Sequence, residues 1–121
     1  MMGCTCGSDC KVTLLYACSG AANTGLLADQ VARTLMGNGK GSMTCLAAVG
    51  ADLSGFLASA RSASQNVVLD GCKVACGAKI FTSKGIPFTH QVMTDFGVVK
   101  GQTPVTGELI EDVAAQIAQR I

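Results

Sequence analysis

The sequence predicts a single doubly wound α/β domain with a mainly parallel four-stranded sheet flanked by helices. Short apolar runs alternate with helical patterns four times along the chain. This alternation favours parallel strands joined by right-handed crossovers. Apolar residues make up 49% of the 121 residues and charged residues 14%, which is typical of a packed core and not of a disordered chain. Fifteen glycines supply tight turns between the elements.

The first half of the chain contains two predicted strands and two predicted helices. Residues 12–17 form a buried strand, after which Asn23 or Thr24 is a candidate N-cap for a helix. Residues 43–49 form the second predicted strand, and Asp52 is expected to cap the next helix. That helix is indicated by apolar residues at helical spacing: Leu53, Phe56, Leu57 and Ala60.

The second half repeats the pattern. Residues 66–69 form a short third strand, and a helix is predicted to begin at or near Cys72 and to end by Gly85. Residues 88–94 form the fourth predicted strand, and Thr106 is expected to cap a final helix. The apolar stripe of that helix consists of Leu109, Val113, Ile117 and Ile121.

The predicted topology places two distant cysteines together. In a Rossmann-like or flavodoxin-like sheet of strand order 2-1-3-4, the ligand crevice lies at the carboxyl ends of the first and third strands. Cys18 ends the first predicted strand, and Cys72 follows the third. We therefore expect these two thiols to be near neighbours at one edge of the sheet.

Composition and charge exclude several classes of protein. The net charge of +1 and the scattered basic residues predict no binding to nucleic acid. No apolar run approaches the ~20 residues of a membrane span, and residues 1–10 are polar and cysteine-rich, unlike a signal peptide. We expect a cytoplasmic protein with a cysteine-containing tail, residues 1–10, and one domain, residues 11–121. Seven cysteines, an odd number, in a reducing compartment do not indicate a disulfide framework.

The segment 70–76 carries the most informative motif, Asp-Gly-Cys followed by a second cysteine at Cys76. On a helix, residues i and i+4 lie on the same face, and a helix N-terminus favours thiolate over thiol. Together with Cys18, the thiols of Cys72 and Cys76 provide three ligands for a soft metal ion. A structural zinc site is tetrahedral, with Zn–S distances of ~2.3 Å, and requires a fourth ligand.

Cys45 is the candidate for the fourth ligand because it lies on the predicted second strand. The alternative for Cys45 is a buried core thiol, since free cysteine packs as a small hydrophobic residue. An iron–sulfur cluster uses the same ligands, but the spacings do not match those of ferredoxins. Three further cysteines in the tail either supply a ligand, hold a second metal or bind nothing: Cys4, Cys6 and Cys10.

Other polar residues near the predicted crevice have two interpretations each. Asp70 and Asp95 either hydrogen-bond to ligand thiols or serve as turn and capping residues. Ser19 and Asn23 either bind an anion at a helix N-terminus or are ordinary turn residues. His90, the only histidine, is expected to be a surface residue of the fourth strand.

At these residues the chain resembles the DGC-domain family, small cysteine-rich α/β proteins regarded as zinc-binding and named for an Asp-Gly-Cys motif. The resemblance extends from residue 12 to residue 110 and rests on four blocks in the same order. It implies zinc binding through Cys18, Cys45, Cys72 and Cys76, and it implies no established reaction. The blocks are Ala17-Cys18-Ser19-Gly20-Ala21, Cys45-Leu46-Ala47, Asp70-Gly71-Cys72 with Cys76 and Lys79, and Thr94-Asp95-Phe96-Gly97 with Lys100-Gly101 and Thr103-Pro104.

The first hypothesis is a zinc-binding protein whose metal is structural or is sensed or handled. Two other classes of function compete with this hypothesis. One is a cysteine-dependent enzyme that uses Cys18 or Cys72 for thiol redox, sulfur transfer or phosphocysteine chemistry. Low-molecular-weight tyrosine phosphatases have an arginine six residues after the cysteine, where this chain has Thr24, and the spacing of Cys72 and Cys76 is too long for Cys-x-x-Cys. The other is an interaction module without chemistry. Four sulfur ligands leave no open position for water, so metal binding is favoured over catalysis.

Overall fold

A four-stranded parallel sheet forms the centre of the computed structural model, which describes residues 11–121. The strand order β2-β1-β3-β4 and the parallel pairing confirm the predicted α/β fold. The predicted tail, residues 1–10, lies outside the described residues. The strands are β1 (Thr13–Ala17), β2 (Ser42–Met43), β3 (Gln65–Asp70) and β4 (Thr89–Val92).

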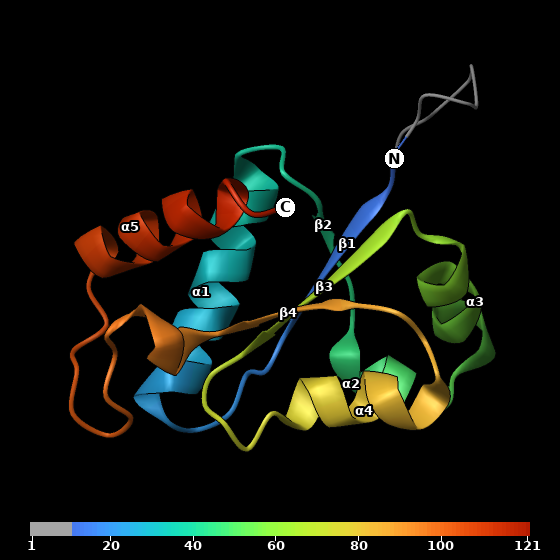
Figure 1. Cartoon of the computed structure of the whole chain (residues 1–121), viewed down its shortest axis with the longest axis horizontal. Helices are drawn as coiled ribbons and strands as arrows, with labels where there is room; N and C mark the ends of the chain where they lie inside the picture. Colours follow the sequence, from blue (N-terminus) through green and yellow to red (C-terminus); the bar gives the residue numbers. More distant parts are fainter. Residues whose placement is uncertain (1–10) are drawn as a thin grey trace.

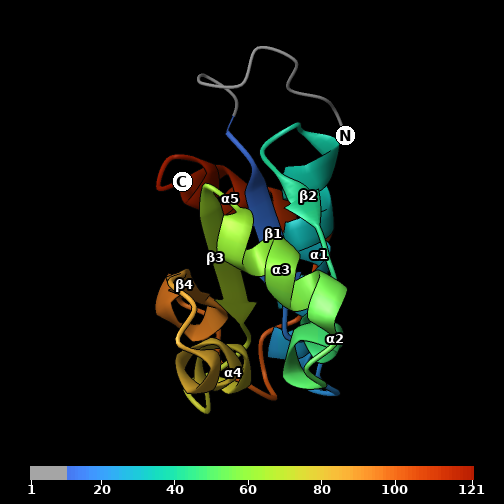
Figure 2. The ribbon, with the colours of Figure 1, turned by 90° about the vertical axis from the view of Figure 1, so that its right-hand side faces the viewer.

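Helices cover both faces of the sheet (Figure 1 and Figure 2). One face packs against α1 and α5, and the other packs against α2, α3 and α4. A 3₁₀ turn, η1 (Met93–Phe96), follows β4. None of the described helices is both long and apolar enough to cross a membrane. The helices are α1 (Asn23–Gly37), α2 (Leu46–Gly50), α3 (Ser54–Ser62), α4 (Cys76–Lys84) and α5 (Gly107–Ala118).

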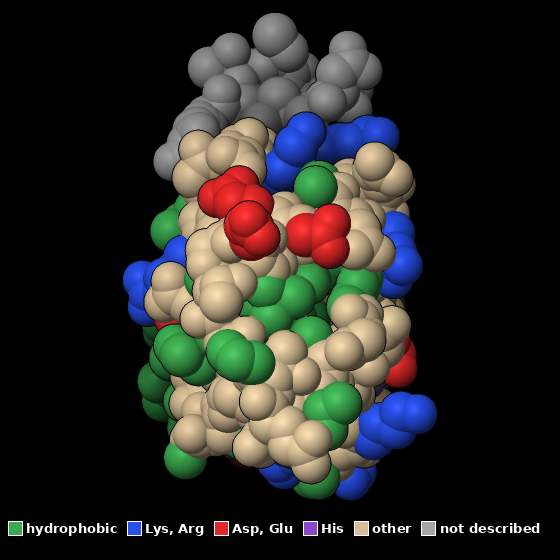
Figure 3. All heavy atoms as spheres, turned by 90° about the vertical axis from the view of Figure 1, so that its left-hand side faces the viewer, with side chains coloured by type: hydrophobic (Ala, Val, Ile, Leu, Met, Phe, Trp, Pro, Cys, Tyr) green, Lys and Arg blue, Asp and Glu red, His purple; other side chains and the backbone are tan. Residues whose placement is uncertain are grey.

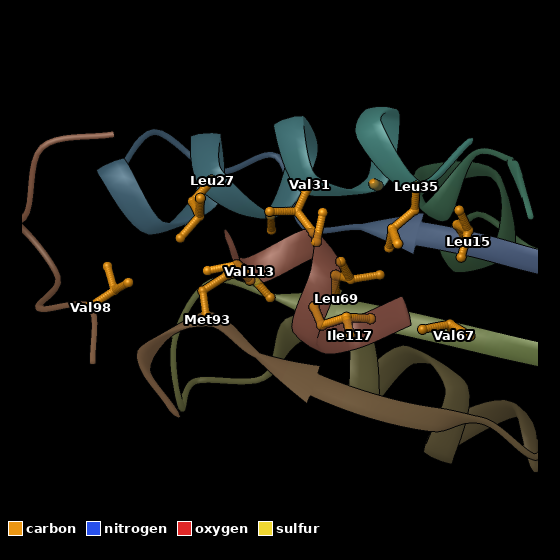
Figure 4. Packing of buried hydrophobic residues seen from close by; sticks show 13 residues of the cluster. Leu15, Leu27, Val31, Leu35, Val67, Leu69, Met93, Val98, Val113 and Ile117 are labelled. Carbon is orange, nitrogen blue, oxygen red and sulfur yellow. The ribbon is translucent and has the colours of Figure 1, made fainter. Parts of the chain in front are cut away.

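Two hydrophobic cores result, because successive side chains of a strand point to opposite faces of the sheet. Leu15 of β1 packs toward α1 and α5, whereas Tyr16 packs toward α4. Figure 4 shows the first core, where side chains of α1 and α5 meet those of β1 and β3. Burial on both faces explains why the strands are apolar runs with little polar alternation.

The surface of the protein is mixed in character. On the face shown in Figure 3, acidic side chains gather in the upper part of the view, hydrophobic side chains gather in the middle, and basic side chains lie around the margins. The acidic residues of α5 are Glu108, Glu111 and Asp112. Glu108, in the first turn, complements the positive end of the helix dipole.

The predicted strand 43–49 is wrong in most of its length. Only Ser42 and Met43 pair with β1, and the chain then turns into the short helix α2. Val49 of α2 is fully buried and packs in the second core. A short apolar run cannot distinguish a buried strand from a buried helical turn, and here tertiary packing decides in favour of the helix.

The predicted helix start at Cys72 is also wrong, because a turn separates Cys72 from the first helical residue, Cys76. Ala75, between them, has a φ of 57°, in the left-handed region, which a continuous α-helix cannot contain. The two cysteines therefore do not lie one helical turn apart on a helix face. Likewise, the predicted strand 88–94 is shorter, since η1 begins at Met93.

The predicted helix caps had mixed outcomes. Thr106 is confirmed, because its hydroxyl accepts a hydrogen bond from the Leu109 amide. Asp52 is not a cap: it has a φ of 61°, and its carboxylate is 2.6 Å from the Lys84 ammonium. Asn23 is the first helical residue of α1, and its side chain bonds elsewhere.

The buried Tyr16 predicts a loss of stability at high pH. Burial raises its pKa from 10.0 to about 12. Below pH 10 both the folded and the unfolded chain keep the phenol proton, and above it the unfolded chain loses the proton first. The free energy of unfolding should therefore fall between pH 10 and pH 12, by about 2 kcal/mol in total for this group.

Urea unfolding at pH 9, 10 and 11, compared with Tyr16→Phe, measures this contribution. The variant loses the hydrogen bond from the phenol to Asn66 Oδ1 (3.1 Å) at every pH, and its stability should depend less on pH. Parallel pH curves for the two proteins would contradict the assignment.

Candidate metal centre

The carboxyl ends of β1, β2 and β3 bring four cysteines to one edge of the sheet, at the lower end in Figure 1. Cys18 directly follows β1, and its amide donates to the Leu69 carbonyl of β3 (2.8 Å). Cys45 is the N-cap residue of α2, and Cys72 lies two residues beyond β3. Parallel strands end at the same edge, so this arrangement follows from the topology. All four are free thiols.

Three of the four cysteines line one open pocket of about 470 Å³ between β1, α2 and α4. They are Cys18, Cys45 and Cys76. Cys45 and Cys76 are exposed, and Cys18 is partly buried. The alternative of a buried core thiol at Cys45 is therefore wrong, because the turn after β2 carries this residue to the surface.

The rest of the pocket is mostly apolar, with one ion pair and the hydroxyl side chains of Ser19 and Thr44. The Arg33 guanidinium donates through Nε to Asp29 Oδ2 (2.9 Å), one turn away on α1. The other oxygen of Asp29 accepts from the Ser19 hydroxyl (3.3 Å). Ser19 thus faces a carboxylate, which opposes anion binding at this point. The hydrophobic walls include Ala17, Met43, Leu46, Ala47 and Ile80.

Cys72 is not among the residues that line this pocket. Its sulfur accepts a hydrogen bond from the Lys100 ammonium, with Nζ and Sγ 3.5 Å apart. Lys100 lies in the loop after η1, 28 residues along the chain. No local spacing in the sequence indicates this contact.

Asn23 holds the loop that carries Lys100. Its side-chain amide donates to the carbonyls of Val99 (3.2 Å) and Thr103 (2.8 Å) and accepts from the Gly101 amide (2.7 Å). All the hydrogen-bonding groups of this amide except one lone pair are thus engaged. The role of Asn23 is to position the loop, and the alternative of anion binding is not supported by these contacts.

Asp70, the first residue of the Asp-Gly-Cys motif, is a buried cap of α4. Its side chain is 1% exposed. One oxygen accepts from the Gly77 amide (2.8 Å), and the other accepts from the Ala78 amide (3.0 Å) and from His90 Nε2 (2.7 Å). The capping interpretation is thereby confirmed. The hydrogen bond between Asp70 and His90 was not predicted from the sequence, because it depends on the pairing of β3 with β4.

Gly71 is required by close packing against the start of α1. A Cβ placed on Gly71 would lie 2.7 Å from the Thr24 carbonyl carbon and 2.8 Å from the Gly25 nitrogen. Both are backbone atoms and cannot rotate away. Gly71 therefore lets the motif turn lie directly against the start of α1.

The donor atoms at this edge are of the kind that a soft metal ion prefers, since thiolates bind zinc and iron–sulfur clusters. Among residues 11–121, however, no three metal-binding side chains are close enough together to hold an ion. The thiols share a pocket without forming a coordination shell. Because Cys18 and Cys45 lie on loops and Cys76 begins a helix, changes of side-chain rotamer and small loop movements are needed to bring the sulfurs together.

Comparison with known proteins assigns the family. The sequence model of the DGC domain matches residues 14–117. The chain belongs to the DGC-domain family. One protein of similar sequence is the anaerobic and virulence modulator AnvM of Pseudomonas aeruginosa, which is 32% identical over 113 residues. That alignment covers 93% of this chain and 82% of AnvM. No solved structure matches the chain. In this member of the DGC-domain family, the name-giving motif provides a helix cap, a close contact and a thiol.

Proposed function

We propose that this DGC-domain protein binds zinc through cysteine thiolates at the carboxyl edge of its sheet. The observation that carries the proposal is the pocket into which Cys18, Cys45 and Cys76 open. Three thiols from three separate segments in one pocket are not needed for packing, since both cores form without them. A set of three thiolates suits Zn²⁺, which binds sulfur ligands well and has no geometric preference from its d-electrons.

The position of the pocket supports a role in metal handling or sensing more than a role in folding. A structural site is normally closed and holds its domain together. Here the pocket is open, two of its thiols are exposed, and the domain has two cores of its own. The name of AnvM describes a modulator. We therefore propose that the bound metal has a regulatory role, in a reducing compartment that keeps the thiols free.

Zinc analysis of the chain purified without chelator tests the proposal. We expect about one zinc per chain and loss of most of it in Cys18→Ser, Cys45→Ser or Cys76→Ser, because each removes one of few thiolate ligands. Thiol titration should show the pocket thiols protected until a chelator is added. Met43→Leu, a change of similar volume in the wall of the same pocket, is the matched control and should retain the metal.

A metal-free protein whose thiols all react freely would contradict zinc binding. Retention of full zinc by all three serine variants would show that the metal binds elsewhere in the chain. Visible absorbance of the purified protein would instead identify an iron–sulfur cluster.

A second candidate function, cysteine-dependent chemistry at Cys72, is favoured by the Lys100 contact. A neighbouring ammonium stabilises a thiolate, which is the nucleophilic form of cysteine. Phosphocysteine chemistry at Cys18 has less support, because Asp29 occupies the side of the pocket where a phosphate would approach Ser19.

Replacing Lys100 with methionine should slow alkylation of Cys72 by iodoacetamide by about threefold, through loss of the favourable charge. Peptide mass spectrometry after timed alkylation measures this rate. Lys79→Met, which removes an exposed lysine from α4, is the control and should leave the rate unchanged. Equal rates in both variants would exclude a role for Lys100 in activating Cys72.

A further inference from the structure

The ammonium of Lys100 has hydrogen-bonding capacity that its contact with Cys72 does not use. The Cys72 sulfur accepts one hydrogen bond from this ammonium, with Nζ and Sγ 3.5 Å apart. An ammonium has three N–H donors. Among residues 11–121 the sulfur is the one hydrogen-bond partner of Lys100 Nζ, and no carboxylate forms an ion pair with it. Two donors therefore remain for an anionic oxygen close to the sulfur.

The surroundings of Cys72 in segment 70–76 do not repel an anion. Cys72 is partly buried, and both Lys100 and Lys73, the residue after Cys72, are exposed. The one carboxylate of the segment, Asp70, is 1% exposed and is already engaged by two amides of α4 and by His90. An anion that approaches this segment therefore meets positive charge and no exposed carboxylate of the segment.

The backbone on both sides of Lys100 is held in place from α1. The Asn23 side chain donates to the carbonyls of Val99 and Thr103 and accepts from the Gly101 amide. Val99 and Gly101 are the two neighbours of Lys100 in the chain. A lysine on a fixed loop has less freedom to lose when it binds a ligand, so its charge is worth more at one position.

We propose that Cys72 reacts preferentially with small electrophiles that carry an anionic group, that Lys100 binds this group, and that Asn23 is the positioning residue of Lys100. The thiol releases its proton to solvent, and the thiolate sulfur attacks the electrophilic carbon. A new S–C bond forms, and the leaving group departs with the electron pair of the bond that breaks. Meanwhile the anionic oxygen accepts a hydrogen bond from the ammonium, which holds the reacting carbon near the sulfur.

This inference rests on the second candidate function, chemistry at Cys72, and adds its class of substrate. It does not depend on the proposed zinc site, because Cys72 is not among the residues that line the pocket of that site.

Alkylation by iodoacetate and by iodoacetamide tests the inference, because the two reagents share a leaving group and differ in charge. The ratio of their rate constants at one thiol does not depend on how much of that thiol is ionised. Peptide mass spectrometry of the full chain, alkylated for timed intervals in EDTA, gives this ratio for each cysteine. We expect the iodoacetate-to-iodoacetamide ratio to be about threefold higher at Cys72 than at the exposed thiols of Cys45 and Cys76.

Two substitutions assign the roles of Lys100 and Asn23. Lys100→Met should lower the ratio at Cys72 about threefold, and Asn23→Ala should lower it about twofold. The double variant should match Lys100→Met, because Asn23 acts only through the lysine. The matched controls are Lys73→Met and Asn38→Ala, an exposed asparagine at the other end of α1, and both should leave the ratio within about 1.5-fold of the wild-type value. Thermal unfolding confirms that each variant is folded.

The results that would overturn the inference can be told apart from failure of the second candidate function. An equal ratio at Cys72 and at the other exposed thiols would overturn the inference, and the candidate function would stand if Lys100→Met still slowed alkylation by iodoacetamide. Unchanged rates for both reagents in Lys100→Met would overturn both. A loss in Lys73→Met as large as in Lys100→Met would mean that general surface charge attracts the anion, which contradicts the inference. A wild-type ratio in Asn23→Ala would contradict the role of Asn23.

Discussion

Replacing Asp70 with alanine is expected to lower the free energy of unfolding by about 3 kcal/mol. The carboxylate is 1% exposed and accepts hydrogen bonds from the amides of Gly77 and Ala78 and from His90. Its removal leaves two amides at the start of α4 and the His90 ring without their partner. Because α4 begins at Cys76, the same change should loosen one wall of the pocket.

Urea unfolding monitored by circular dichroism measures the effect. Asp95→Ala removes an exposed carboxylate of η1 and is the matched control, with an expected change within about 0.5 kcal/mol. Equal stability of the two variants would show that Asp70 is not the cap that fixes α4. Zinc content measured in parallel should fall in Asp70→Ala and remain unchanged in Asp95→Ala.

Gly71→Ala is the second change with a large expected effect, a loss of about 2–3 kcal/mol of stability. The added methyl group would lie 2.7 Å from the Thr24 carbonyl carbon and 2.8 Å from the Gly25 nitrogen, so the motif turn or α1 must move. Since Cys72 follows directly, the contact of its sulfur with Lys100 should be lost as well.

Gly55→Ala provides the matched control, because a Cβ at Gly55 of α3 would meet no atom within 4 Å. That change should be neutral or slightly stabilising, by less than about 1 kcal/mol, since alanine favours helix over glycine. Melting temperatures of the two variants measured under the same conditions compare these effects. A similar melting temperature for both would mean that the motif turn tolerates a side chain at Gly71.

Much of the fold could be predicted because it depends on local pattern. Short apolar runs bounded by glycine and polar residues mark β1 and β3, and the alternation with helices leads to a parallel sheet of order β2-β1-β3-β4. The errors occur where the local pattern is ambiguous. The apolar run after Met43 suits a strand or a helix equally, and the turn before Cys76 depends on one left-handed residue, Ala75.

The candidate site was predictable in its position and not in its internal arrangement. Cys18 and Cys72 follow the adjacent parallel strands β1 and β3, as the strand order predicts, but only Cys18 lines the pocket. The contact of Cys72 with Lys100 joins segments 28 residues apart through a loop that Asn23 positions from a third segment. No periodicity along the chain contains that information.

By itself, the sequence determined which chemistry is available in segment 70–76, which contains the Asp-Gly-Cys motif and the cysteine after it. Thiol count, spacing and strand order were sufficient to place this chemistry at the carboxyl edge of a parallel sheet. Only the tertiary structure decided how the four thiols are divided, with three in the pocket and Cys72 beside Lys100. The physical reason is that strand order follows from local patterns of burial, whereas the partner of a side chain depends on where distant loops meet.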